Sequence, residues 1–247
     1  MKQYLLRFSL PSGVRMYPNV LREALARSNT LPPAFFGYDP ETGKPLCEKP
    51  LSADKTPTQA QLANPKAIPP IRIVGATTWV GILATGEQAK QLLDAATMPA
   101  ITAVTAHCKK PVPVQVEEHD LSIASQEWPT VYWVREMVIK KGLAAASDEE
   151  TQMAVIKRRL EASLIAQADH YGMDCPPESL LDIRITEIVR SRGLQIVGSD
   201  GPTPQYAALF DVRFLAHAAL KGFWFAGNLT ARGYGRIGSA TYGKGAA

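Results

Sequence analysis

The residues best suited to chemistry lie near the end of the sequence, where glycines alternate with cationic and aromatic side chains. The glycines are Gly233, Gly235 and Gly238, and between them lie Arg232, Tyr234 and Arg236. Glycine allows close approach to the backbone, N–H groups and guanidiniums donate to phosphate oxygens, and a tyrosine ring stacks on a base. The tract is therefore typical of a nucleic-acid contact. A glycine-rich hairpin that closes a sheet would have the same composition.

Two further groups of cations are predicted to lie on helices. In the segment 18–28, Arg22 and Arg27 fall outside the apolar stripe formed by residues 20, 21, 24 and 25. Lys157, Arg158 and Arg159 are consecutive within a longer helical segment. Such side chains are often merely solvated. Three adjacent cations on a stiff element would also suit the phosphate backbone of an RNA helix.

Residues 220–227, LKGFWFAG, and 230–237, TARGYGRI, resemble the C-terminal glycine-rich loop of the CRISPR-associated RAMP proteins. Within that superfamily they are most similar to the guide-RNA-processing endoribonucleases, with the branch found in type IV systems as one candidate. The resemblance implies an endoribonuclease that cleaves precursor RNA at repeat hairpins, retains the mature crRNA, and meets other CRISPR effector subunits. It implies RNA binding by the following residues: Lys157, Arg158, Arg159, Lys221, Arg232, Tyr234 and Arg236.

Metal-independent RNA cleavage uses the substrate's own 2′-hydroxyl as nucleophile, so the protein must align it, remove its proton and stabilise the developing charge. The resemblance implies a histidine base near the first helix, but the first histidine in this sequence is His107. Arg22 and Arg27 are therefore the candidate catalytic residues, acting as electrostatic clamps because arginine stays protonated. Tyr17, Tyr38 and His107 remain alternatives for the base. We expect no cofactor and no metal.

Two other functions fit the same residues. The missing histidine favours a non-catalytic RAMP subunit that binds crRNA in an effector complex. Because the motif is short, an RNA-binding protein unrelated to CRISPR is also consistent with it. The endoribonuclease and the crRNA-binding subunit both predict binding that weakens steeply as salt rises.

Composition narrows the class of protein. The chain has 247 residues, a net charge of +4 and 46% hydrophobic residues, so it can form packed cores and bind a polyanion. Its three scattered cysteines form no CxxC pair. The sequence shows no signal peptide and no long apolar run, which predicts a cytoplasmic protein without a membrane partner. The match to GxGxxG at Gly233 lacks the strand and helix of a dinucleotide site.

The order of predicted elements favours an α+β fold. A strand at 2–10 and a helix at 18–28 precede an irregular insertion at about 30–69. One or two strands at 68–83, a short helix at 86–98 and further strand within 101–123 complete the first half.

The second half repeats this order. Its predicted elements are a strand at 130–140, a helix from a Ser147 cap with Glu150 in a capping box to about Tyr171, a hairpin of 180–189 with 194–197, and a strand at 206–215 followed by an Ala-rich turn of helix. We therefore predict two tandem ferredoxin-like, RRM-type βαββαβ domains, at 1–125 and 126–247, with the glycine-rich loop at 221–240.

Overall fold

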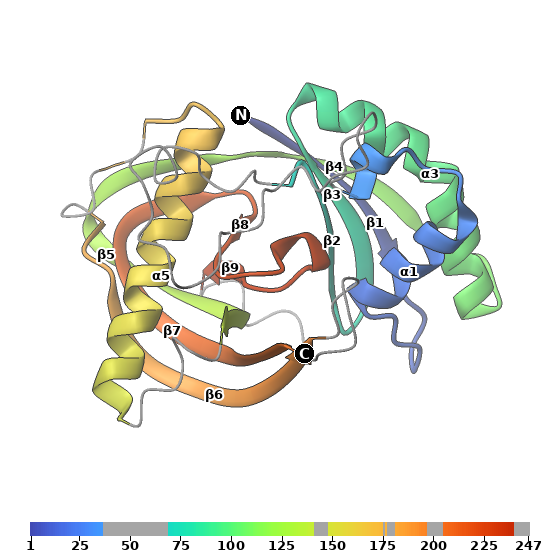
Figure 1. The fold of residues 1–247 in the computed structure, drawn as a ribbon. Coiled ribbons are helices and arrows are strands. Elements are labelled where there is room, and N and C mark those ends of the chain that lie inside the picture. Colours follow the sequence, from blue (N-terminus) through green and yellow to red (C-terminus); the bar gives the residue numbers. More distant parts are fainter. Residues whose placement is uncertain (37–68, 141–147, 175, 177–180, 197–204, 240–247) are drawn as a thin grey trace. The chain divides into compact units, whose positions relative to one another are not determined.

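The computed structural model describes residues 1–36, 69–140, 148–174, 176, 181–196 and 205–239 (Figure 1). The chain divides into two compact units. The first comprises Met1–Asp120 together with Ala231–Gly233, and the second comprises Leu121–Thr230 and Tyr234–Ala247. No helix in the described part of the chain is both long and apolar enough to span a membrane. The predicted Tyr38 and most of the predicted insertion lie outside the described residues.

The first unit has the order β1, α1, η1, β2, β3, α3, β4. Its elements are β1 (Lys2–Ser9), α1 (Pro18–Ser28), the short 3-10 helix η1 (Pro33–Phe36), β2 (Ile71–Ala76), β3 (Trp79–Thr85), α3 (Glu87–Cys108) and β4 (Val114–Asp120). The strands form one antiparallel sheet in the order β2-β3-β1-β4. Two helices packed on a sheet of this order make a ferredoxin-like βαββαβ unit, as predicted.

Alternating apolar residues explain how β1 meets the helices. Tyr4, Leu6 and Phe8 share one face of the strand and are buried in the core of the first unit. Leu21 and Leu25 of α1, one helical turn apart, belong to the same core. The predicted bounds of α1 are confirmed.

Helix α3 is longer than predicted, so the prediction of strand from residue 101 was wrong. The segment from Ile101 was expected to be strand, but α3 continues through Pro99 to Cys108. Ala96, Ala100 and Val104 are buried at intervals of four residues, so packing of this stripe overrides the local preference of the β-branched residues. The first strand after the helix is β4.

The second unit contains one long helix and five strands among its described residues. These are β5 (Ser122–Lys140), α5 (Glu149–His170), β6 (Arg184–Ile196), β7 (Gln205–Lys221), β8 (Trp224–Phe225) and β9 (Arg236–Ser239). The sheet is antiparallel, in the order β6-β7-β5-β9-β8. Strand β9 therefore takes the place beside β5 that β4 takes beside β1 in the first unit.

Two local predictions in this unit were wrong. The expected hairpin at 180–197 is one continuous strand, β6, which pairs with β7 from Arg184 to Ile196. The expected turn of helix after Leu215 is also strand, because β7 continues to Lys221 and pairs with the start of β5. Both segments gain their hydrogen bonds from a distant strand, which local periodicity does not reveal.

The N-cap of helix α5 lies one residue later than predicted. Asp148, and not Ser147, is the N-cap, and its carboxylate accepts a 2.7 Å hydrogen bond from the Thr151 amide. The apolar stripe of the helix, which includes Ile156, Leu160 and Leu164, is buried in the core of the second unit as expected. Because this face of α5 is buried in the core, the polar side chains on its other faces can contact other segments or a ligand.

Candidate nucleic-acid interface

The glycine-rich tract forms a tight, hydrogen-bonded structure in the second unit. The amide of Ala226 donates to the Gly235 carbonyl, and the amide of Gly235 donates to the Arg135 carbonyl on β5. Gly235 has a φ of +72°, and a Cβ there would lie 1.8 Å from the Ala226 carbonyl oxygen. Only glycine satisfies both restrictions, so this residue is needed to bring β8 and β9 together.

Polar side chains of α5 hold the segment that leads into the tract. The Arg159 Nη2 donates to Asn228 Oδ1 at 2.6 Å, Ser163 Oγ accepts from the Gly227 amide at 3.2 Å, and Gln167 Nε2 donates to the Phe225 carbonyl at 2.5 Å. Residues 159, 163 and 167 are spaced by four and so share one face of the helix. Together they form a polar ladder that fixes the backbone at 225–228.

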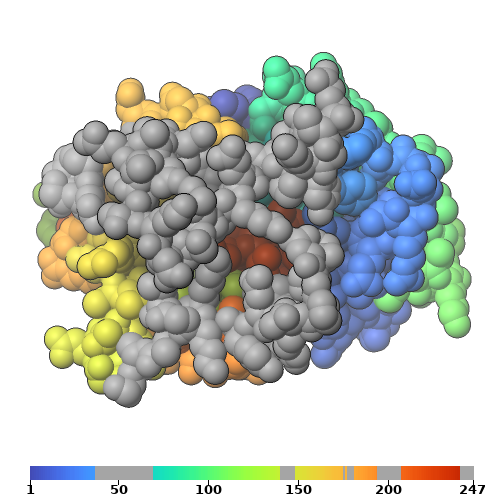
Figure 2. All heavy atoms as spheres, viewed as in Figure 1, coloured from blue at the N-terminus to red at the C-terminus, as the bar shows by residue number. Residues whose placement is uncertain are grey.

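This ladder changes the interpretation of the basic run on α5. Arg159 points to Asn228, and burial lowers the pKa of its guanidinium. Its neighbours Lys157 and Arg158 are exposed, although Lys157 Nζ lies 3.7 Å from the buried Glu161 carboxylate. Part of α5, yellow in Figure 2, reaches the surface of the face drawn there. The three consecutive cations therefore have different surroundings.

The tip of the tract belongs to the first unit. Residues 231–233 cluster with that unit, where a Cβ on Gly233 would lie 2.5 Å from the Ile73 carbonyl oxygen and 3.2 Å from side-chain atoms of Pro18. Pro18 is the first residue of α1, and Arg22 follows it by four residues on the same helix face. The glycine-rich tip thus lies against the start of α1, one turn from Arg22.

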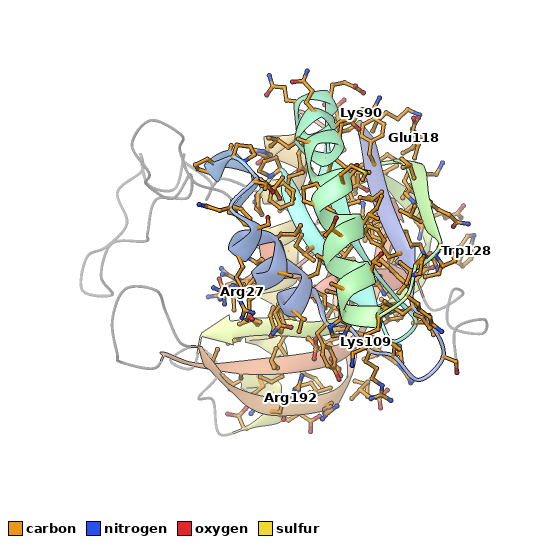
Figure 3. The ribbon with its side chains drawn as sticks, turned by 90° about the vertical axis from the view of Figure 1, so that its right-hand side faces the viewer. Arg27, Lys90, Lys109, Glu118, Trp128 and Arg192 are labelled. Carbon is orange, nitrogen blue, oxygen red and sulfur yellow. The ribbon has the colours of Figure 1, made fainter. Side chains whose placement is uncertain are left out.

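The two candidate catalytic arginines are not brought together. Arg22 is half-buried: its Nη2 donates to the Phe36 carbonyl at 3.2 Å and its guanidinium lies 5.5 Å from the Phe36 ring centroid. Arg27 is exposed and pairs with Glu23 at 3.5 Å; its label marks it on α1 in Figure 3. Five residues along a helix correspond to a rotation of about 140°, so the two arginines have different directions.

Three further predicted RNA-binding residues lie in the segment 221–240 that was predicted as the glycine-rich loop. Lys221 and Arg232 are exposed. Tyr234 is half-buried and packs against the small cluster of Val138, Ala207 and Leu209. Its ring therefore contributes to the packing of the tract.

The described candidates for the general base differ in their surroundings. Tyr17 is the N-cap of α1 and its side chain is exposed. His107 was expected in a strand but lies in the last turn of α3, where its Nε2 is 2.9 Å from the Arg15 carbonyl oxygen. A carbonyl only accepts, so Nε2 carries the proton, and in the neutral ring Nδ1 is free to accept one.

The sequence reasoning missed one cluster on β5 and β9. The Arg135 and Arg236 guanidiniums lie 4.6 and 5.7 Å from the ring centroid of Trp133. The alternation of buried Tyr132 and Val134 with Trp133 and Arg135 was a signal that these two share the other face of the strand. Their association with Arg236 depends on long-range pairing of β5 with β9.

A metal site would need several acidic, histidine or cysteine side chains close together. Among the residues that the structure describes, no group of three or more His, Cys, Asp or Glu side chains is placed to hold a metal ion. The buried Cys108 has a raised pKa because of its burial, so its thiol is kept protonated.

Comparison with known structures first defines the class. Two solved structures, described as "Crystal structure of Cas6b" and "Crystal structure of CRISPR RNA processing endoribonuclease Cas6b", superpose with TM-scores of 0.61 and 0.58. They are 11% and 12% identical to this chain, and each match covers 97% of this chain and 100% of the other. At this identity the match shows the fold, and the chain therefore has the ferredoxin-like fold of these proteins.

A nearer relationship is then apparent. The family described as "Type IV CRISPR-associated endonuclease Csf5" matches residues 1–241. A solved structure described as "Csf5, CRISPR-Cas type IV Cas6 crRNA endonuclease" is 46% identical, with a TM-score of 0.83, over 97% of this chain and 99% of that chain. The chain belongs to the Csf5 family of type IV CRISPR-associated endonucleases, which confirms the resemblance noted in the sequence. A search of curated protein sequences finds no match.

Proposed function

We propose that this chain is a metal-independent endoribonuclease that processes CRISPR precursor RNA at repeat hairpins and retains the mature crRNA. The family is named for endonucleases, and the Csf5 structure is described as that of a crRNA endonuclease. A crRNA-processing endoribonuclease is therefore the function that these similarities support. The metal-independent mechanism and the residues that carry it are our own inference.

The observation that carries the site is the packing of Gly233 on Pro18. This contact holds the glycine-rich tip, with exposed Arg232 beside it, against the start of α1, and Arg22 lies one turn further along the same face of the helix. The contact with Phe36 restricts the Arg22 side chain, so less conformational entropy is lost when it binds phosphate. We assign Arg22 to the scissile phosphate.

In this mechanism the 2′-hydroxyl oxygen attacks the adjacent phosphorus, and the bond to the 5′-oxygen of the next nucleotide breaks. The departing 5′-oxygen takes up a proton from a general acid or from water, and the products are a 2′,3′-cyclic phosphate and a 5′-hydroxyl. Arg22 stabilises the negative charge that develops on the non-bridging oxygens, which is worth about 10²–10³ in rate for one well-placed donor. Arginine is a poor base, so another group must remove the proton of the 2′-hydroxyl. Among the described residues, Tyr17 and His107 are the candidates for this general base.

The other cations are assigned to binding. Arg27, in the last turn of α1, is directed away from Arg22 and would hold a neighbouring phosphate. Exposed Lys157, Arg158, Lys221 and Arg232 would contact the RNA backbone. Arg159 would act on RNA through Asn228 and the glycine-rich tract, since its guanidinium is largely buried and its Nη2 donates to Asn228.

The test is cleavage of a labelled repeat transcript from the host's CRISPR array in EDTA, with chemical analysis of both product ends. Wild-type protein should yield the cyclic phosphate, and Arg22→Ala should slow single-turnover cleavage about 10²–10³-fold while Arg27→Ala mainly weakens binding. Arg213→Ala, an exposed arginine paired with Glu187, is the control. Tight binding of the transcript without cleavage by wild-type protein would refute the nuclease assignment and favour a non-catalytic subunit.

A further inference from the structure

Two arginines face each other across neighbouring strands of the second unit. In the antiparallel pairing of β5 with β9, Arg135 is the register partner of Arg236, and Trp133 is the partner of Gly238. Side chains directly opposite each other on one face are close, and like charges in such positions repel. The pairing therefore places two cationic side chains beside each other on one face of the sheet, where both can donate to one anion.

A single aromatic ring supports both cations. The Trp133 ring lies on the backbone of Gly238, where a Cβ would come within 2.4 Å of a ring carbon. The guanidiniums of Arg135 and Arg236 lie 4.6 and 5.7 Å from its centroid. A guanidinium stacked on a ring keeps its N–H donors directed outward in its own plane, so it can still fork onto a phosphate.

A β-bulge positions Arg135. The register of β5 against β7 shifts between Val134 and Met137, and Glu136 within this shift has a φ of +52°. Two contacts hold this conformation: the Glu136 amide donates to Asp211 at 2.7 Å, and its carboxylate pairs with Arg192, which is labelled in Figure 3. Bulges commonly direct a side chain toward a functional site, and their strain is retained where it serves one.

The surroundings of Arg135 differ from those of two other arginines of the same sheet. Arg192 pairs with Glu136 and Arg213 pairs with Glu187, so these cations are locally neutralised. Among the described residues, no carboxylate forms an ion pair with Arg135, and its side chain is exposed. Arg135 therefore presents its charge to solvent beside the half-buried ring of Trp133.

We propose that Trp133, Arg135 and Arg236 form a binding site for one phosphodiester of a single-stranded stretch of the RNA substrate. The base next to this phosphodiester would stack on the side chains of Trp133 and Arg135. This inference rests on the proposed function, because it takes the substrate to be RNA. A single strand fits better than a duplex, since its bases are free to stack on a protein group. The site contributes affinity for the RNA and fixes the position of the strand on the protein, and it takes no part in bond cleavage.

The test uses Arg135→Glu, which separates binding from folding. Glutamate opposite Arg236 forms an attractive pair, so this variant should melt at or above the wild-type temperature. Its dissociation constant for repeat RNA carrying single-stranded flanks should nevertheless rise at least about 10-fold. Arg135→Ala should raise it about 5- to 20-fold and reduce the salt slope by about 0.7, the value for one phosphate of a single strand.

Arg213→Ala is the matched control, because it removes an exposed but neutralised arginine from the same sheet. It should change the dissociation constant less than about 2-fold. Binding is measured on RNA whose 2′-hydroxyl at the mapped cleavage position is replaced by hydrogen, and the Arg135 effect should vanish when the single-stranded flanks are deleted. Equal affinity of Arg135→Glu and wild type, or equal weakening with and without the flanks, would overturn the proposal. If wild-type protein neither binds nor cleaves the repeat, the proposed function itself fails.

Discussion

The hydrogen bond between Arg159 and Asn228 allows the stability of the glycine-rich segment to be tested quantitatively. We consider Asn228→Ala, which removes the acceptor and leaves the backbone bond from the Asn228 amide to the Val138 carbonyl possible. The Arg159 guanidinium is largely desolvated, and its Nε has no hydrogen-bond partner among the described residues. The variant therefore leaves a poorly solvated cation without its amide partner.

The expected loss of stability depends on whether one partner of the Arg159–Asn228 hydrogen bond is removed or both are. A hydrogen bond to a charged group is worth about 1.5–3 kcal/mol, and leaving a buried charge unsatisfied places the loss in the upper part of that range. We expect Asn228→Ala to destabilise the segment by about 2–3 kcal/mol. Arg159→Ala also removes the desolvated charge, so we expect a smaller loss of about 1 kcal/mol, and the double variant should resemble Arg159→Ala.

Hydrogen exchange measured by mass spectrometry reports this locally. Amides in the peptide 222–230 include those of Ala226, Gly227 and Asn228, all hydrogen-bonded in the structure. A loss of 2–3 kcal/mol corresponds to exchange about 30- to 150-fold faster, and a loss of 1 kcal/mol to about 5-fold. A peptide from β1 should be unchanged, and Arg158→Ala, which removes the exposed neighbour, should leave the peptide 222–230 protected.

Two results would refute the reasoning. Exchange in Asn228→Ala less than about 3-fold faster than in wild type would show that the bond contributes little to holding the segment. Additive effects of the two substitutions in the double variant would show that Arg159 and Asn228 act independently. Either result would also return Arg159 to the set of direct RNA contacts.

Three further predictions concern stability. Gly235→Ala places a Cβ 1.8 Å from the Ala226 carbonyl oxygen at a φ of +72°, so urea denaturation should show a loss of at least about 2 kcal/mol, and a loss below about 0.5 kcal/mol would contradict this. The hydrogen bond to Glu87 raises the pKa of Tyr4 from 10.0 to about 12. This bond therefore stabilises the fold fully below pH 10, and the stabilisation is lost as the pH rises toward 12. The melting temperature of Tyr4→Phe should not show this alkaline loss. The Thr151 amide lowers the pKa of Asp148 below 3.8, so its stabilisation is present above that pH and is lost as the pH falls further, and Asp148→Ala should flatten the acid limb.

Much of the first unit could be predicted because local patterns decide it. The strand at Lys2–Ser9 and the helix at Pro18–Ser28 follow from periods of two and of about four residues, and these periods place apolar side chains in a core. The stripe of α5 was predicted on the same basis, and its cap was misplaced by one residue. The glycine-rich motif was recognised from its resemblance to a family motif, and the structure adds that a Cβ at Gly233, Gly235 or Gly238 would collide with neighbouring atoms.

Segments whose partners are distant in sequence could not be predicted in this way. The helix at 101–108, the continuous strand at 184–196 and the extension of β7 to Lys221 each gain stability from packing or pairing with remote residues. Local propensity is weaker than such interactions and gave the wrong element in each case.

The sequence by itself determined the α+β class, the family resemblance and the residue types available for RNA chemistry. Only the tertiary structure decided which of these residues meet. It brings Gly233 to Pro18, turns Arg159 to Asn228, and sets Arg135 opposite Arg236 over Trp133. The physical reason is that strand register and helix packing act between residues separated by scores of positions, whereas periodicity in the sequence reports only the face on which each side chain lies.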